Sequence, residues 1–238
     1  MPSALLPALA LVHSPLVGPA TWAGVAGILG ARGYQVGVPD LRPTVGAGPP
    51  YYSRQVEVIV AGLPSSGPVV LVGHSGAGAL LGQVPGQAGR AGRPVAGCVF
   101  VDAGLPIPGR SLMSAMPPEL AAGLRAMANL DGWLPPWPKW WEADELGGLL
   151  PDQALRERFE AECPPLPLAL FDEVHPLAPD WDAIPGAYLL LSEGYEDSAA
   201  DARTRGWPVL ERLSDHLAPV TDPVAVADAV ADLVSTFA

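Results

Sequence analysis

The chain of 238 residues contains only two cysteines, Cys98 and Cys163. Two isolated cysteines fit neither a zinc framework nor a disulfide scaffold. The sequence also lacks an H-E-x-x-H motif, a Cys/His cluster and a glycine-rich phosphate loop. We therefore expect neither a metal nor an organic cofactor.

Positive charge is scarce. There are 13 Lys and Arg residues against 25 Asp and Glu, which gives a net charge of −12. Phosphate contacts require clustered Lys and Arg, so this balance argues against a nucleic acid partner. It also disfavours electrostatic docking on an anionic membrane.

Long hydrophobic runs are missing as well, although 49% of the residues are hydrophobic. The longest apolar stretches fall short of the roughly 20 residues that span a bilayer. The first residues, MPSALLPALALV, lack a basic leader and a small-residue cleavage site. We expect a cytoplasmic protein, either a monomer or a homodimer.

Short apolar runs of strand length alternate with longer amphipathic stretches in the first 102 residues, and again after residue 184. Continuous apolar strands in this order indicate an α/β fold, in which a parallel sheet is buried on both faces by helices. The expected strands are Leu9–His13, Tyr34–Pro39, Val69–Gly73, Val95–Asp102, Ala187–Ser192 and Trp207–Leu213. The expected helices are Thr21–Arg32, Tyr51–Leu63, one beginning near Ser75, Ser198–Arg205 and Pro223–Phe237.

The alternation stops between Ala103 and Ile184. No strand is expected there, and proline and tryptophan become dense, as in LPPWPKWW. About 80 residues with so many prolines would make a poor independent core. The sequence therefore predicts a core of residues 1–102 and 185–238, with residues 103–184 inserted as a helical lid.

Ser75 is the candidate nucleophile. It follows the apolar strand Val69–Gly73 and precedes a stretch of small residues. A nucleophile elbow is a tight turn that needs small residues two positions before and after the serine, and Gly73 and Ala77 occupy them here. The alternative is a serine with only a structural role in the turn.

His216 is the candidate general base. It lies just past the last expected strand and before the last helix. A neutral imidazole at this point can accept the serine proton and return it to a leaving group. The alternative is a histidine in a surface loop.

Five short pieces of the chain resemble the α/β-hydrolase superfamily, and most of all its compact bacterial esterases and lactonases. The pieces are LALVHSP, VGVPDLRP, LVGHSGAG, VFVDAGLP and DHLAPVTDP. The resemblance extends over nearly the whole chain. It implies an α/β-hydrolase fold with Ser75 as nucleophile and His216 as base.

The acid that orients His216 has more than one candidate. The commonest family position follows the strand Ala187–Ser192, but SEGYED there is a poor match to the usual Gly-x-x-Asp pattern. Other members place the acid after the preceding strand, where Asp102 ends VFVD. A carboxylate fixed at a strand end orients an imidazole well, so we favour Asp102. Glu196 and Asp197 remain the alternatives.

The oxyanion hole departs from the family pattern. One donor is expected to be the N–H of Gly76, the residue after the nucleophile. Relatives often carry His-Gly-x after the first strand, whereas this chain has His-Ser-Pro, and Pro15 has no N–H to donate. The Leu16 N–H or the Ser14 hydroxyl would have to substitute. Alternatively, Ser14 binds substrate or water, or merely forms a turn.

Aromatic residues crowd the predicted lid, with several methionines upstream. Such side chains can line an adaptable apolar pocket, or they can pack the lid onto the sheet. The candidate substrate-binding residues are His74, Trp133, Trp137, Trp140 and Trp141.

These observations predict a serine hydrolase that cleaves an ester, thioester or lactone of a small hydrophobic molecule through an acyl-serine intermediate. The same Ser–His pair could instead drive elimination, cyclisation or acyl transfer, since Pro15 removes a usual oxyanion donor. A third hypothesis is a non-catalytic ligand-binding protein of the same fold, against which the intact Ser75 and His216 argue.

Overall fold

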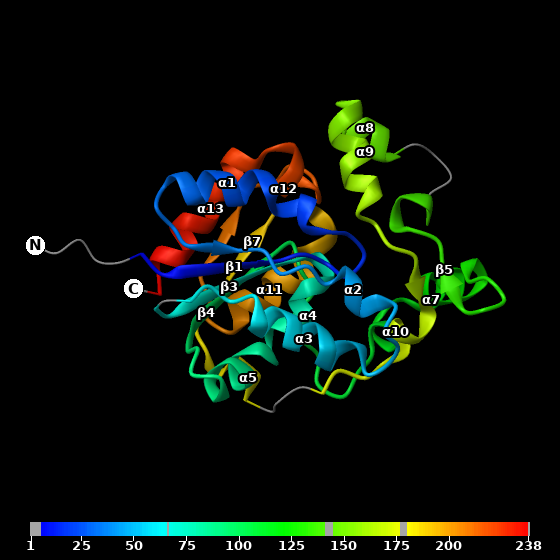
Figure 1. Cartoon of the computed structure of the whole chain (residues 1–238), viewed down its shortest axis with the longest axis horizontal. Helices are drawn as coiled ribbons and strands as arrows, with labels where there is room; N and C mark the ends of the chain where they lie inside the picture. Colours follow the sequence, from blue (N-terminus) through cyan, green and yellow to red (C-terminus); the bar gives the residue numbers. More distant parts are fainter. Residues whose placement is uncertain (1–5, 66, 141–144, 177–179, 238) are drawn as a thin grey trace, which may run out of the picture.

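A six-stranded parallel sheet forms the centre of the molecule in the computed structural model (Figure 1), which describes residues 6–65, 67–140, 145–176 and 180–237. The strand order is β2-β1-β3-β4-β7-β8. All pairings in this sheet are parallel. Its strands are β1 (Ala8–Val12), β2 (Val36–Gly37), β3 (Val69–His74), β4 (Val95–Val101), β7 (Gly186–Leu190) and β8 (Val209–Glu211). The predicted α/β-hydrolase fold is confirmed.

Helices cover both faces of this sheet, because alternate residues of the central strands point to opposite sides. In β1, Leu9 and Leu11 pack toward α1 and α13, whereas Ala10 and Val12 pack toward α3, α5 and α11. These helices and the shorter ones of the same region are α1 (Ala23–Ala31), α2 (Arg42–Val45), α3 (Tyr51–Ala61), α4 (Gly78–Leu81), α5 (Val84–Arg90), α11 (Glu196–Thr204), α12 (Ala218–Thr221) and α13 (Pro223–Ser235), with the 3₁₀ turns η1 (Pro19–Trp22), η2 (Ser75–Ala77) and η5 (Glu193–Tyr195).

The described elements between Leu112 and Asp172 lie beside the carboxyl ends of the strands (Figure 1). The expectation that it holds no strand is wrong, since β5 and β6 form an antiparallel pair. Each has only two residues, which is too short for an alternating pattern to show in the sequence. The elements are α6 (Leu112–Ala115), α7 (Pro118–Met127), β5 (Trp133–Leu134), η3 (Trp137–Trp140), α8 (Glu145–Leu149), α9 (Gln153–Ala161), β6 (Leu166–Pro167), α10 (Leu168–Asp172) and η4 (Trp181–Ala183).

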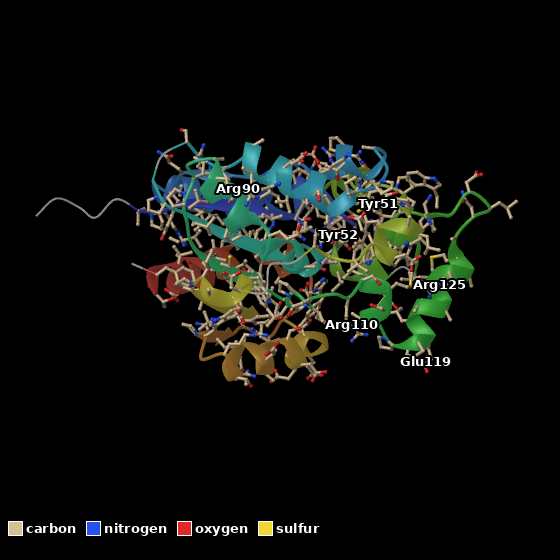
Figure 2. The ribbon with its side chains drawn as sticks, turned by 90° about the horizontal axis from the view of Figure 1, so that it is seen from below. Tyr51, Tyr52, Arg90, Arg110, Glu119 and Arg125 are labelled. Atoms are coloured by element: carbon tan, nitrogen blue, oxygen red, sulfur yellow. The ribbon has the colours of Figure 1, made fainter. Side chains whose placement is uncertain are left out.

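Two carboxylates fasten this segment to the rest of the chain. Glu162 Oε2 accepts a hydrogen bond from the Ala20 N–H at 2.7 Å. Glu173 accepts from the N–H groups of Tyr51 and Tyr52 at 2.7 and 3.0 Å, where α3 begins and its amide groups have no partner within the helix. Figure 2 labels both tyrosines at this end of α3, and it shows Arg125 on the outer helix α7. The described parts of this segment around Glu162 and Glu173 are thereby held against the sheet edge that carries the candidate site.

Candidate active site

Ser75 occupies a strained turn at the end of β3. Its φ of 57° lies in the left-handed region, which costs a residue with a side chain about 1–2 kcal/mol. Close packing on both sides of the turn explains its small residues. A Cβ on Gly73 would lie 2.9 Å from Leu81, and a Cβ on Gly78 would lie 2.2 Å from the carbonyl oxygen of Gly104. The tightest position after the serine is therefore Gly78, one residue beyond the Ala77 that the motif highlights.

Three of the predicted residues form one hydrogen-bonded chain. His216 follows β8, and its Nε2 lies 3.0 Å from Ser75 Oγ. Its Nδ1 lies 2.8 Å from Oδ2 of Asp102, which is fully buried at the end of β4. A carboxylate only accepts hydrogen bonds, so the imidazole donates through Nδ1, and in the neutral ring Nε2 then presents a lone pair to the serine.

Four hydrogen bonds hold the carboxylate of Asp102. Besides His216, its donors are the N–H groups of Leu191 and Ser192, each at 2.9 Å, and the Ser192 hydroxyl at 2.6 Å. Burial alone would raise the pKa of Asp102, but these hydrogen bonds together hold the pKa below its ordinary value. Asp102 therefore carries a negative charge at neutral pH.

The alternative acids lie elsewhere. Glu196 and Asp197 are exposed on α11, and Glu196 accepts a hydrogen bond from Arg203 at 2.8 Å. The structure thus brings Asp102 to His216 and leaves these two carboxylates in solvent.

The predicted oxyanion residues meet in the crevice between β1 and β3. The connections that follow β1 and β3 leave toward opposite sides of the sheet, and ligands bind at such a switch point in open α/β sheets. A Cβ on Gly76 would lie 2.9 Å from Ser14 Oγ, so the Ser14 hydroxyl is adjacent to the Gly76 backbone. The Leu16 N–H donates to Ser14 Oγ at 3.3 Å. The Leu16 N–H is thereby directed to the Ser14 oxygen, and the Ser14 hydroxyl keeps its own proton to donate.

His13, which sequence reasoning did not select, fixes this loop. Its Nδ1 donates to the Ser14 carbonyl at 2.8 Å, and its Nε2 accepts from the Leu41 N–H at 3.1 Å. Acceptance of this hydrogen bond at Nε2 requires the neutral ring. Burial lowers the pKa of His13, which keeps the ring neutral.

Two rings enclose the imidazole of His216. His74 lies on one side at 4.6 Å between ring centroids and donates through Nε2 to the His216 carbonyl at 2.8 Å. Burial lowers the pKa of His74 to about 3. Tyr195 stacks with its plane 5° from that of His216 at a centroid distance of 5.0 Å, and its hydroxyl lies 3.4 Å from Ser75 Oγ. Sequence reasoning missed Tyr195, and the only available signal was the unusual SEGYED sequence after β7.

A cavity of about 270 Å³ opens above Ser75. Of the predicted substrate-binding residues, His74, Trp137 and Trp140 line it. Trp133 is not among the lining residues and packs against the hydrophobic cluster that contains Leu134 and Phe171. Trp141 lies outside the described residues. The lining consists of Ser14, Leu16, Val17, His74, Ser75, Met116, Leu120, Leu124, Trp137, Trp140, Tyr195, His216 and Leu217.

The described part of the chain shows no group of three or more His, Cys, Asp and Glu side chains arranged to hold a metal ion. Within the same residues, no helix is both long and apolar enough to cross a membrane.

A sequence model of the alpha/beta hydrolase family matches residues 9–229, a range that includes the elbow serine, Asp102 and His216. The chain belongs to this family. No similar sequence was found among curated proteins.

Solved structures of other α/β-hydrolases share the fold. An extracellular alpha/beta-hydrolase from Paenibacillus superposes with a TM-score of 0.72 at 19% identity, covering 95% of this chain and 98% of that one. A pyrethroid hydrolase from Sphingobium faniae gives 0.62 at 23% identity, covering 96% and 97%. A variant of tomato methylketone synthase I, complexed with β-ketoheptanoate, gives 0.72 at 18% identity, covering 99% and 100%. These likenesses concern the fold alone, so the activity of this α/β-hydrolase has to be argued from its site.

Proposed function

We propose that this α/β-hydrolase cleaves an uncharged, apolar carboxylic ester, thioester or lactone through an acyl-Ser75 intermediate. One observation carries the proposal. The hydrogen-bonded chain from Asp102 through His216 to Ser75 opens directly into the apolar cavity. A serine activated in this way attacks a bound carbonyl carbon.

The reaction proceeds in two stages. Ser75 Oγ bonds to the carbonyl carbon while its proton passes to His216 Nε2, and the imidazolium is stabilised by Asp102. The resulting oxyanion accepts hydrogen bonds from the Gly76 N–H and the Ser14 hydroxyl. Collapse breaks the bond to the leaving group, which takes the proton from His216. Water then attacks the acyl-enzyme by the same sequence of proton transfers and releases the acid.

The cavity supports an apolar substrate. Its lining is largely apolar, and no Asp, Glu, Lys or Arg occurs among the described residues around it. A charged group next to the reacting carbonyl would lose its hydration there without gaining an ion pair. A volume of about 270 Å³ fits a small molecule.

The uncharged lining also bears on the non-hydrolytic alternatives. A β-keto acid, the kind of ligand bound to the tomato methylketone synthase, carries a carboxylate, and no cation among the described lining residues would hold it. Elimination, cyclisation or acyl transfer on an uncharged substrate would need the same Ser–His pair. Such chemistry is the second candidate, because the Ser14 hydroxyl stands here in place of the backbone N–H that Pro15 lacks.

Intact-protein mass spectrometry after treatment with a fluorophosphonate tests the proposal. A single adduct is expected on the wild type, with its loss in Ser75→Ala and a strong reduction in His216→Ala. Ser65→Ala, which changes an exposed serine, is the matched control and should label fully. Folded wild-type protein that takes no adduct and cleaves no uncharged ester would contradict the hydrolytic function and leave non-hydrolytic chemistry or ligand binding.

A further inference from the structure

The reaction above assigns no role to Tyr195. Its phenol ring stacks on the imidazole of His216, and its hydroxyl lies 3.4 Å from Ser75 Oγ. It also lines the cavity. A residue that served only to pack the imidazole would need no hydroxyl at this point.

The turn that carries Tyr195 is tied to the same carboxylate as His216. In η5, the Tyr195 N–H donates to the Ser192 carbonyl at 3.2 Å. The N–H and hydroxyl of Ser192 in turn donate to Asp102. One buried carboxylate thus sets the position of both the imidazole and the phenol.

The protons of the site can be assigned one by one. His216 Nδ1 donates to Asp102, so Nε2 is bare and accepts the Ser75 proton. Ser75 Oγ is then free to accept, and the Tyr195 hydroxyl is the donor. Burial raises the pKa of Tyr195, so the phenol keeps its proton at neutral pH.

The phenol lies on the imidazole side of Ser75. The oxyanion donors come from the turns after β1 and β3, whereas Tyr195 and His216 follow β7 and β8, on the other side of β4. In serine hydrolysis the leaving group departs toward the histidine, because it takes its proton from Nε2. The phenol is therefore placed next to the departing oxygen and away from the oxyanion.

We propose that Tyr195 is a catalytic residue that donates a hydrogen bond to the leaving-group oxygen during acylation and to the attacking water during deacylation. The contact of 3.4 Å to Ser75 Oγ is long for a bond between two hydroxyls, so little is lost when the phenol turns to a substrate oxygen. As the bond from carbon to the leaving oxygen breaks, that oxygen gains negative charge and the hydrogen bond strengthens. His216 supplies the proton, and Tyr195 keeps its own throughout. This inference rests on the proposed serine hydrolysis.

Two esters of one acid distinguish this role from packing. The leaving group of ethyl butanoate is the strongly basic ethoxide, which needs stabilisation as it departs. The leaving group of p-nitrophenyl butanoate is p-nitrophenolate, which is a stable anion. Tyr195→Phe keeps the stacked ring and removes the hydroxyl. We expect kcat/KM for the ethyl ester to fall about 10–100-fold, as for loss of one transition-state hydrogen bond. For the p-nitrophenyl ester it should fall by less than about threefold.

Equal losses on both esters would assign Tyr195 to packing and overturn the inference, as would no loss on either. The rate of fluorophosphonate labelling separates this failure from failure of the hydrolytic function. Labelling of Tyr195→Phe close to the wild-type rate shows an intact Ser75 and His216. Absence of labelling in the wild type would contradict the hydrolytic proposal itself. Tyr34→Phe is the matched control, because Tyr34 precedes β2 at the opposite edge of the sheet.

Discussion

Ser75 and Asp102 share a backbone conformation that no other described non-glycine residue adopts, with φ values of 57° and 42°. Each follows directly on one of two neighbouring strands, and the preceding residues, His74 and Val101, are paired in the register of β3 with β4. Strain of this kind persists where the surrounding structure enforces it, and it occurs often at active sites. The two strained turns point their side chains toward the same imidazole, one at each ring nitrogen.

Replacement of the buried carboxylate tests which acid supports His216. Asparagine tolerates positive φ, so Asp102→Asn should fold. It loses the negative charge that opposes the imidazolium, and kcat for an ester should fall by about 10⁴, as in serine proteases whose triad acid is changed in the same way. Steady-state kinetics of Asp102→Asn beside Glu196→Gln and Asp197→Asn checks this. A large loss in either α11 variant, with Asp102→Asn active, would show the acid to be on α11.

The Ser14 hydroxyl is the second donor proposed for the oxyanion, in place of the N–H that Pro15 lacks. Ser14→Ala removes it, and loss of one such donor costs about 100-fold in kcat or more. KM should change little, because the interaction strengthens only as charge develops. Ser14→Thr, which keeps a hydroxyl, is the matched control. Full activity of Ser14→Ala would leave the Gly76 N–H as the sole donor or return the role to Leu16.

The fold could be predicted from the sequence because its strands are buried on both faces. Val69–His74 is wholly buried, and its run of apolar residues is what a central parallel strand requires. Asp102 could be selected because a carboxylate that ends such a strand reaches the same edge as the elbow serine. These are local features, and local features are visible in one sequence.

The missing parts of the site depend on tertiary contacts. Nothing in SEGYED shows that Tyr195 stacks on a residue 21 positions later. The density of tryptophan near η3 does not tell which ring faces the cavity, so Trp137 and Trp133 could not be separated. Leu120 and Leu124 line the cavity only because α7 is carried over Ser75 by the packing of residues 103–184.

The close approach at Gly78 gives a stability prediction. A Cβ there would lie 2.2 Å from the Gly104 carbonyl oxygen and 3.0 Å from Ala103 Cβ, and neither group is the end of a flexible side chain. Gly78→Ala should lower the free energy of unfolding by about 1–3 kcal/mol. Gly89→Ala is the control, since a Cβ at this position in α5 meets nothing within 4 Å and should raise stability by about 0.4–1 kcal/mol. Urea unfolding of both variants decides whether the elbow is as tightly packed as its geometry indicates.

Three buried histidines make the stability depend on pH. Burial is the largest cause of the lowered pKa of His13, His74 and His175, and the value for His74 is about 3. The unfolded chain has ordinary histidines with a pKa of about 6.5. Below that pH the unfolded state therefore binds more protons than the folded state, so acid favours unfolding. Their contribution is complete above about pH 6.5 and is lost as the pH falls toward the folded-state values.

Each of these histidines should lower the free energy of unfolding by up to about 1.4 kcal/mol per pH unit below about pH 6. Carboxylates change the free energy of unfolding only at lower pH, so its pH dependence between about pH 6.5 and pH 5 comes from histidine. Urea titrations across this window measure the slope, and the range from about pH 7 to pH 8.5 serves as the flat reference. His175→Phe keeps a ring against Tyr52, whose ring centroid lies 3.8 Å from that of His175, and removes one titrating group, so the slope should decrease. A wild-type slope near zero would contradict the prediction, because it would show that these imidazoles bind protons as readily in the folded protein as in the unfolded chain.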